Sequence, residues 1–462
     1  MNSAALFSKT PPLKLFFLAS LPGAVGMLAS ALYQTVDGIF VGQFLGETAF
    51  AALNLAMPFV IINFALADLI GVGSSVPISI SLGRKQEEEA NNIFSCACVM
   101  IVGAWAVVGG ILYAAAPLLI RLMGAEGDFA AMAVQYLRVY ALCSPLTTIV
   151  FAMDNYLRIS GFIKGSMYLN ILMSALIAGM EFLFLGVLGW GIWAAALATC
   201  AGMVICAAIS TIPFLRGRAV LHFRRPRFRW AMVRQIVGCG APNFLNNIAG
   251  RITSILMNAI LVRLGGESAV SVYGVLMYAE GFIQPLLYGM CDSLQPAVGY
   301  NWGAQKYSRV RAIEKCCFTA SAAVSLLSVA AIGLLPEQIT HLFMPGAAQE
   351  VFQLSVGALR LFSLTYLTRW FSFATQSYML AIEKPLPASL ISVSTALIFT
   401  VVLIAVLWPL GLTGIWLNFA GTSLLAALLA GGILLRCRRD LARPDGDLPE
   451  PPEERENPGE SA

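Results

Sequence analysis

Residues 15–41 read LFFLASLPGAVGMLASALYQTVDGIFV, and Asp37 is the only acidic or basic side chain in this run. The run is long enough to cross a bilayer, which takes about 20 apolar residues as a helix. A secretory signal has a shorter apolar region of about 7–15 residues, so we expect an uncleaved first span. A carboxylate at the bilayer centre costs roughly 2.5–3.5 kcal/mol, so Asp37 needs either a partner or a function.

The composition of the whole chain indicates the same class of protein. Of the 462 residues, 58% are hydrophobic and 12% are charged, whereas a typical soluble domain has about 25% charged residues. The 10 cysteines lie mostly inside apolar runs and show no zinc-binding spacing. We therefore expect an all-α polytopic membrane protein without a cofactor or a resident metal.

Twelve apolar runs, each of roughly 20 residues or more, are long enough to span a membrane. Their approximate limits are 13–41, 51–82, 93–119, 130–156, 166–188, 192–215, 236–262, 269–299, 316–335, 351–380, 387–408 and 414–435. If both termini are cytoplasmic, the inner segments, with Arg158 among them, hold 23 of the 29 Lys and Arg residues. Because cytoplasmic loops carry an excess of positive charge, this predicts an N-in, C-in topology.

Two segments outside the spans have a biased composition. The linker 216–235 contains RGRAVLHFRRPRFRW, which is strongly basic. A nucleic-acid-binding patch is one interpretation, but the position favours a cytoplasmic topological lock that lies against anionic lipid, with no nucleic-acid partner. The segment 436–462 is rich in Pro and Glu near its end and is predicted to be a disordered cytoplasmic tail.

An internal repeat divides the spans into two groups. A shift of 220 residues aligns Pro22 with Pro242 and Gly83 with Gly303. This predicts a six-span N-lobe in 1–215 and a pseudo-symmetric six-span C-lobe in 236–435. An even number of spans in each lobe gives both the same orientation, and parallel repeats of this kind occur in transporters that rock two lobes around a central site.

Asp37 belongs to a polar stripe on the first span. Four polar side chains are spaced by 0, 3, 4 and 7 positions and so share one helix face: Ser30, Tyr33, Gln34 and Asp37. Such a stripe avoids lipid and faces the lobe interior or a water-filled cavity. In the second half, Met257 takes the position of Asp37, so the acid is a feature of the N-lobe alone.

Glu181 and Thr199 are expected at the depth of Asp37. Asp37 and Glu181 lie about four and seven residues from the predicted outer ends of their spans, which is roughly 6–11 Å at 1.5 Å per residue. Thr199, on the sixth span, reaches the same level. Two acids and a hydroxyl at one depth could bind a cation such as Na⁺ or share a proton.

Further polar or adaptable side chains inside the spans are candidates for a transport cavity. Together with Tyr33 and Gln34 they are Asp154, Asn155, Thr253, Met257, Glu280 and Gln284. Each acid also has a structural interpretation, in which an arginine such as Arg251 or Arg369 neutralises it or the acid caps a broken helix. The same alternative applies to Asp68 and Asp292.

Several stretches together resemble the MATE family (multidrug and toxic compound extrusion), in its bacterial MepA-like branch. They are YQTVDGIFVGQFLG at 33–46, LIGVGSSVPISISLGRKQEEEA at 69–90, GAPNFLNNI at 240–248 and LQPAVGYNWGAQKYSRVRA at 294–312. The resemblance implies twelve helices, alternating access between two lobes, and export of organic cations by antiport with protons or sodium. It also implies a location in the bacterial inner membrane.

The resemblance further implies that Asp37 occupies the family's first-span acid position. It places an Asp of the ion site at Glu181, an Asn at Ile177 and a Thr at Thr199. Losing the Asn oxygen weakens a sodium site, whereas a proton needs only a carboxyl group. Burial and a neighbouring carboxylate both favour the protonated form of an acid, so the departure favours protons over sodium.

Three other functions remain open at this point. A flippase for a lipid-linked substrate shares the general fold, but it would need a strongly basic cavity, and the spans offer chiefly Arg251, Arg360 and Arg369. A membrane enzyme lacks a visible nucleophile–base set. A degenerate member without ion coupling is a further alternative, suggested by Ile177. We expect a monomer that binds small organic cations.

Overall fold

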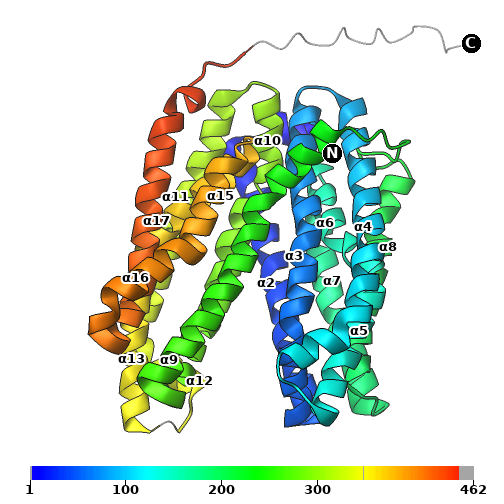
Figure 1. Cartoon of the computed structure of the whole chain (residues 1–462). Helices are drawn as coiled ribbons and strands as arrows, with labels where there is room; N and C mark the ends of the chain where they lie inside the picture. Colours follow the sequence, from blue (N-terminus) through cyan, green and yellow to red (C-terminus); the bar gives the residue numbers. More distant parts are fainter. Residues whose placement is uncertain (1–2, 347, 447–462) are drawn as a thin grey trace, which may run out of the picture.

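The computed structural model describes residues 3–346 and 348–446, without the side chains of residues 3, 33 and 34. These residues form helices joined by short connections, arranged as two bundles side by side (Figure 1). The first half contains α1 (Ser3–Lys9), α2 (Pro12–Leu45), α3 (Glu47–Gly83), α4 (Glu87–Leu122), α5 (Gly127–Thr147), α6 (Ile149–Ile159), α7 (Ile163–Glu181) with a π-helical extension (Phe182–Val187), and α8 (Ile192–Leu215).

The second half begins with a helix of 63 residues, about three times the length of one span. It contains α9 (Trp230–Asp292), α10 (Gln295–Gly303), α11 (Tyr307–Leu334), α12 (Pro336–Phe343), α13 (Gln349–Ser363), α14 (Tyr366–Ala381), α15 (Pro385–Val393), a π-helical turn (Ser394–Ile398), α16 (Phe399–Leu407), a 3₁₀ turn (Trp408–Leu410) and α17 (Gly411–Leu441). Because a helix satisfies its own backbone hydrogen bonds, the helical structure of the described residues suits a chain surrounded by lipid.

The described residues contain nine helices that are long and apolar enough to cross a membrane, or ten if the bent pair α13 and α14 is one span. Two of the nine, Trp230–Gly303 and Pro385–Leu441, have 74 and 57 residues, far more than the 17–25 or so of one span. The first breaks at Gly266, where φ is 61° and ψ is −152°. The second turns at Gly411, where φ is 57°. Twelve spans therefore stay a prediction, whereas the all-helical polytopic class is confirmed.

Two glycines related by the repeat make equivalent turns. Gly46 joins α2 to α3 with φ at 86°, and Gly266 divides α9 with φ at 61°. Side chains with a Cβ atom rarely adopt this left-handed region, so each half places a glycine at the turn after its first long helical segment. The sequence repeat, which aligns Gly46 with Gly266, is thus visible in the backbone.

The two halves contact each other backbone to backbone at one end of the molecule. A Cβ atom on Gly83 would lie 2.0 Å from the Tyr300 carbonyl oxygen, and one on Gly303 would lie 2.2 Å from the Ile80 carbonyl oxygen. These positions are exchanged by the shift of 220 residues. The C-terminal ends of α3 and α10 therefore cross at the pseudo-symmetry axis. A Cβ on Gly240 of α9 would likewise lie 1.9 Å from the Leu69 carbonyl oxygen.

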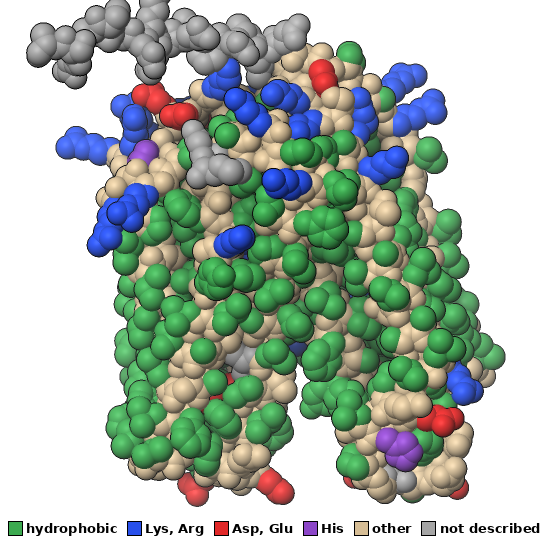
Figure 2. All heavy atoms as spheres, turned by 180° about the vertical axis from the view of Figure 1, so that it is seen from behind, with side chains coloured by type: hydrophobic (Ala, Val, Ile, Leu, Met, Phe, Trp, Pro, Cys, Tyr) green, Lys and Arg blue, Asp and Glu red, His purple; other side chains and the backbone are tan. Residues whose placement is uncertain are grey.

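The charged side chains distinguish the two ends of the molecule. Figure 2 shows Lys and Arg gathered at the end where the lobes meet, and a hydrophobic surface along the bundles. A cleft between the lobes opens at the opposite end (Figure 2). The distribution agrees with the positive-inside rule, under which the closed end would be cytoplasmic. The orientation itself stays a prediction.

The basic linker packs on the first bundle. The backbone N–H groups of His222 and Arg227 donate to Asn91 Oδ1 and Asn92 Oδ1 of α4, at 2.6 and 2.8 Å. Arg224 and Arg229 form ion pairs with Glu88 and Glu89 at 3.2 and 3.1 Å. The linker is therefore attached to α4 through its backbone as well as its charges, a contact that the sequence did not predict.

The end of the chain is more ordered than predicted. α17 continues to Leu441, so the helix runs past the predicted tail boundary at residue 436. Asp445 accepts hydrogen bonds from the backbone N–H of Ser308, at 2.7 Å, and from its hydroxyl, and these bonds lower the pKa of Asp445. Residues 447–462, where the rest of the predicted disordered tail falls, lie outside the described residues.

The seam between the lobes generates a stability prediction. Gly240→Ala places a methyl group against the backbone of Leu69 and should cost about 1–3 kcal/mol, the usual penalty for overpacking. The control is Gly238→Ala in the same helix, where a Cβ meets nothing within 4 Å. Thermal unfolding of both variants in detergent should show a lower midpoint for Gly240→Ala only. Equal midpoints would mean that the seam is not tightly packed.

Candidate functional site

Asp37 and Glu181 form a buried carboxyl pair in the first bundle. Asp37 is 2% exposed and Glu181 is 0% exposed. The Tyr136 hydroxyl donates to Asp37 Oδ2 at 3.4 Å, and the Thr199 hydroxyl donates to Glu181 Oε1 at 3.2 Å. The two carboxyl groups are within hydrogen-bonding reach of each other. The structure thus brings together the three residues predicted as the ion-coupling site and adds Tyr136.

Four helices place these side chains at one level. Asp37 lies eight residues before the end of α2 at Leu45, and Thr199 lies seven residues after the start of α8 at Ile192. At 1.5 Å per residue, both are about 10–12 Å from that end of the bundle. Glu181 is the last α-helical residue of α7 before its π-helical extension. π-helical turns occur often at functional sites, where they redirect a side chain.

Tyr136 had no signal in the sequence that would identify it. It is fully buried on α5, and its ring centroid lies 5.1 Å from that of Tyr140. An aromatic residue in an apolar span is most often part of the hydrophobic core. Only the fold shows that its hydroxyl reaches Asp37.

Ile177 is an apolar residue one turn from Glu181 on α7. It is fully buried. A Cβ atom on Gly202 of α8 would lie 2.7 Å from Ile177 Cγ1, so the isoleucine packs tightly against that glycine. The position therefore supplies no oxygen atom to a bound cation.

The polar stripe on α2 faces α7, inside the bundle. The Ser30 hydroxyl donates to Asn170 Oδ1 at 3.1 Å, and Asn170 Nδ2 donates to Asp154 Oδ1 at 2.9 Å. The Ser174 hydroxyl donates to the Ala29 carbonyl oxygen at 3.0 Å. The side chains of Tyr33 and Gln34 lie outside the described residues, so their predicted place in the cavity stays a prediction.

Asp154 has a structural partner. Arg158, one turn later on α6, forms an ion pair with Asp154 Oδ2 at 2.5 Å, and the Ser166 hydroxyl donates to Asp154 Oδ1 at 2.5 Å. Arg158 is only 6% exposed. Arg158 lies next to the last residue of α6 and is buried in the packed interior, so it is not a solvated loop charge, and its predicted cytoplasmic side stays a prediction. Arg158 Nη1 also contacts Ser293 Oγ of the second half at 3.5 Å.

Glu280 is paired in the second bundle. Arg369 Nη2 lies 2.6 Å from Glu280 Oε1, and the Tyr366 hydroxyl donates to Glu280 Oε2 at 2.5 Å. Arg369 is thus the counter-charge that the sequence analysis suggested. Asp292 accepts hydrogen bonds from Gln295 Nε2 at 2.9 Å and from the Ser377 hydroxyl at 3.1 Å.

The remaining cavity candidates have mixed positions. Met257 is fully buried in the hydrophobic core of the second half and so does not line an open cavity, which corrects its prediction. The Thr253 hydroxyl donates to the Ala396 carbonyl oxygen at 2.5 Å, and Asn155 Nδ2 donates to the Phe151 carbonyl oxygen at 3.1 Å. Gln284 is partly buried on α9 and hydrogen-bonds to Tyr288.

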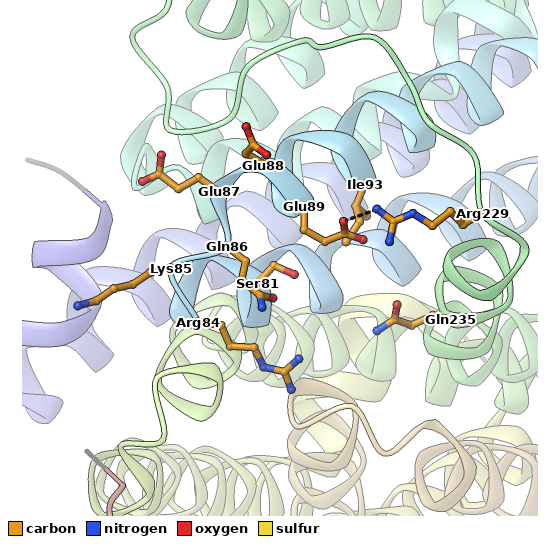
Figure 3. Close-up of a pocket in the computed structure, with 10 residues that line it drawn as sticks. All are labelled: Ser81, Arg84, Lys85, Gln86, Glu87, Glu88, Glu89, Ile93, Arg229 and Gln235. Carbon is orange, nitrogen blue, oxygen red and sulfur yellow. Dashed lines mark hydrogen bonds and ion pairs between the residues drawn. The ribbon is translucent and has the colours of Figure 1, made fainter. Parts of the chain in front are cut away.

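A separate pocket of about 760 Å³ lies at the basic end, between the α3–α4 loop and the linker (Figure 3). Arg84, Lys85 and Glu87 are among its lining residues, and Glu89 points to Arg229 across it. α3 begins next to the end of α2 near Asp37 and runs to this opposite end. The pocket is therefore distinct from the acid pair.

Comparison with known proteins gives one consistent family. The sequence pattern of the family described as MatE matches residues 22–184 and 242–406. The multidrug export protein MepA of Staphylococcus aureus (strain NCTC 8325 / PS 47) is 25% identical over 454 residues, covering 94% of this chain and 96% of that protein. MepA of Staphylococcus saprophyticus is 25% identical over 439 residues, covering 92% and 94%.

Solved structures share the fold. A crystal structure of MATE in complex with MaL6 has a TM-score of 0.89 at 23% identity, covering 96% of this chain and 98% of that one. An outward-facing conformation of a multidrug resistance MATE transporter also has a TM-score of 0.89, at 22% identity, with the same coverage. At this identity the likeness concerns the fold.

The Asp154–Arg158 pair predicts a specific pattern of stability. Arg158→Gln leaves the Asp154 carboxylate, whose side chain is 14% exposed, without a counter-charge and should cost about 3 kcal/mol, the lower end of the range for a broken buried pair. The double variant Asp154→Asn, Arg158→Gln removes both charges and should recover most of that loss. Unfolding of the two variants in detergent tests this. A double variant as unstable as the single one would show that Arg158 acts through its Ser293 contact instead.

Proposed function

This chain belongs to the MATE family of multidrug efflux transporters, multi-pass proteins of the cell membrane and not enzymes, and we propose that it exports small organic cations by antiport with protons. The carboxyl pair of Asp37 and Glu181 is proposed as the coupling site, with Thr199 and Tyr136 as its hydrogen-bonding partners. The transport cycle is alternating access between the N-lobe and the C-lobe, and the monomer is the proposed transport unit.

The observation that carries this proposal is the burial of two carboxyl groups without a cation. Asp37 Oδ1 and Glu181 Oε2 have no hydrogen-bond partner outside the pair. Among the described residues, no ion pair involves either acid. Two carboxyl groups in hydrogen-bonding contact need at least one proton between them, because two adjacent charges would repel each other in a low-dielectric site. The pair is therefore suited to take up and release a proton.

The geometry gives less support to sodium. A sodium ion needs several oxygen ligands, and the described groups offer two carboxyls and the hydroxyls of Thr199 and Tyr136. Ile177, one turn before Glu181, packs against Gly202 and offers no side-chain oxygen. The sodium alternative would require a carbonyl or water oxygen in the place of that side chain.

Coupling to cargo follows from charge. When the acid pair is deprotonated, its negative charge favours a cation in the cavity, and protonation removes that attraction. If the open end faces the outside, protons enter there and release the cargo. The seam at Gly83 and Gly303 would then open toward the cytoplasm, where the pair loses its proton and a new cation binds. The mechanism needs the two lobes to move as bodies, as in other parallel-repeat transporters.

A flippase for a lipid-linked substrate is less well supported. The phosphate groups of such a substrate carry several negative charges and need several unbalanced cations close together, whereas Glu280 offsets the charge of Arg369. Of the three arginines named above, this leaves only Arg251 and Arg360 without an ion pair among the described residues. A non-coupled transporter is disfavoured by the intact acid pair.

The coupling proposal is tested with purified protein in proteoliposomes, with ethidium added outside and internal pH followed by a trapped dye. The wild-type protein should move protons when ethidium is added. Asp37→Asn should abolish this movement, and Glu181→Gln should reduce it partially, because Asp37, at the position of the family's first-span acid, is proposed as the main coupling group and is retained in the second variant. Both variants should insert and express normally.

Three outcomes would contradict the proposal. Unchanged proton movement in Asp37→Asn would show that the acid is structural. Equal and mild losses in the two variants would place ion coupling elsewhere. Cargo movement driven only by a sodium gradient would show that Ile177 does not prevent a sodium site.

Ile177 gives a second prediction. Ile177→Asn restores an amide oxygen one turn from Glu181, so a sodium gradient should drive ethidium transport better in this variant than in the wild type. Ile177→Leu, which keeps the site apolar, is the matched control and should respond like the wild type. If sodium dependence does not increase in Ile177→Asn, the missing oxygen is not what favours protons.

A further inference from the structure

Arg369 has spare hydrogen-bond donors, whereas Glu280 has both carboxylate oxygens in use. Glu280 Oε1 binds Arg369, and Oε2 accepts from the Tyr366 hydroxyl. A guanidinium group carries five N–H donors in a planar fork. Glu280 occupies one face of this fork, and Tyr288 contributes a further hydrogen bond. An incoming ligand would therefore meet the cation of this pair and not its carboxylate.

The exposure of the pair indicates which side faces water. The Arg369 side chain is 24% exposed, compared with 11% for Glu280. A charged side chain in contact with lipid at this depth would be costly, so charged groups within spans face the bundle interior or a water-filled cavity. The exposed part of the guanidinium is thus assigned to the cleft between the lobes.

An aromatic wall lies beside the guanidinium. The Tyr288 ring of α9 stacks on Phe373 of α14, with 3.8 Å between the ring centroids. Gln284, one turn before Tyr288, hydrogen-bonds to it. A flat organic molecule could pack on this wall while an anionic substituent reaches Arg369, because aromatic surfaces bind planar ligands in offset or edge contacts.

The N-lobe has no counterpart of this charge. Under the repeat, Glu280 aligns with Val60, and Tyr366 and Arg369 align with Ser144 and Thr147. Ser144 instead accepts a neutral hydrogen bond from Asn63 Nδ2 at 2.9 Å, so the same helix pair is held together without ions. Packing of α9 against α14 therefore does not by itself require an arginine.

We propose that Arg369, positioned by Glu280 and Tyr366, is an anion subsite of the transport cavity that takes the carboxylate or sulfonate of a zwitterionic organic substrate. The cationic end of such a substrate would be attracted to the N-lobe acid pair. The proposal rests on the proposed drug-export function and narrows its cargo to molecules with both charges, alongside simple cations.

The test uses two dyes that differ only at the anionic group, a rhodamine with a free carboxylate and its methyl ester. Fluorescence polarisation measures the Kd of each dye for the purified protein, so that binding is separated from transport. Glu280→Gln, Arg369→Gln is the main variant, because it removes both charges and leaves no buried carboxylate unpaired. Arg360→Gln, which removes an exposed arginine of α13 outside this cluster, is the matched control.

The double variant should bind the carboxylate dye about tenfold more weakly, which corresponds to about 1.4 kcal/mol. Its Kd for the ester should stay within about twofold, and Arg360→Gln should change neither Kd. Glu280→Gln alone should strengthen binding of the carboxylate dye, because it frees the guanidinium. If the ion pair is only structural, the double variant should instead bind both dyes more weakly or bind both as the wild type does.

The opposite results overturn the inference. An anion subsite at Arg369 would be excluded if the double variant changed the Kd of both dyes equally or changed neither. It would also be excluded if the wild-type protein bound only the ester. Transport in proteoliposomes separates this result from the parent proposal. Proton-driven export of the ester without any Arg369 effect would leave the antiporter intact, whereas export of neither dye would remove both proposals.

Discussion

The structure depends on one constraint, which is that a charge inside a membrane must be paired, protonated or in contact with water. Two acids meet it with arginines, Asp154 with Arg158 and Glu280 with Arg369. Asp37 and Glu181 meet it only through each other and two hydroxyl groups. The same constraint thus separates the acids into two functional classes. An acid with a permanent counter-ion holds helices together, whereas an acid without one can change its proton occupancy.

The sequence predicted the part of this arrangement that follows from spacing. Turns mark the ends of helices, so the depths of Asp37, Glu181 and Thr199 follow by counting residues, and the structure places the three within one hydrogen-bonded group. The repeat predicted corresponding positions such as Gly83 and Gly303. The physical reason is that both features are local or periodic, and neither needs knowledge of side-chain packing.

The features that the sequence did not predict concern which face of a helix meets which neighbour. Met257 occupies the position of Asp37 in the second half, but burial in the core keeps it out of any open cavity. Arg158 follows an apolar run, and its ion pair with Asp154 near the end of α6 could not be read from the sequence. Tyr136 carries no charge and no motif, so its contact with Asp37 depends wholly on how α5 packs. Tertiary packing therefore determines the surroundings of all three side chains.

The repeat also explains why site chemistry differs between the lobes. Both halves keep the glycines that shape the turns and the seam, because those positions are fixed by backbone geometry. The charged positions have diverged, with the Asp37–Glu181 pair in the N-lobe and the Glu280–Arg369 pair in the C-lobe. A proton that binds to the N-lobe pair therefore opposes the cationic part of the cargo and does not compete directly with an anionic group at Arg369. Separate locations would allow protonation to weaken one contact of the cargo while a contact in the other lobe is kept.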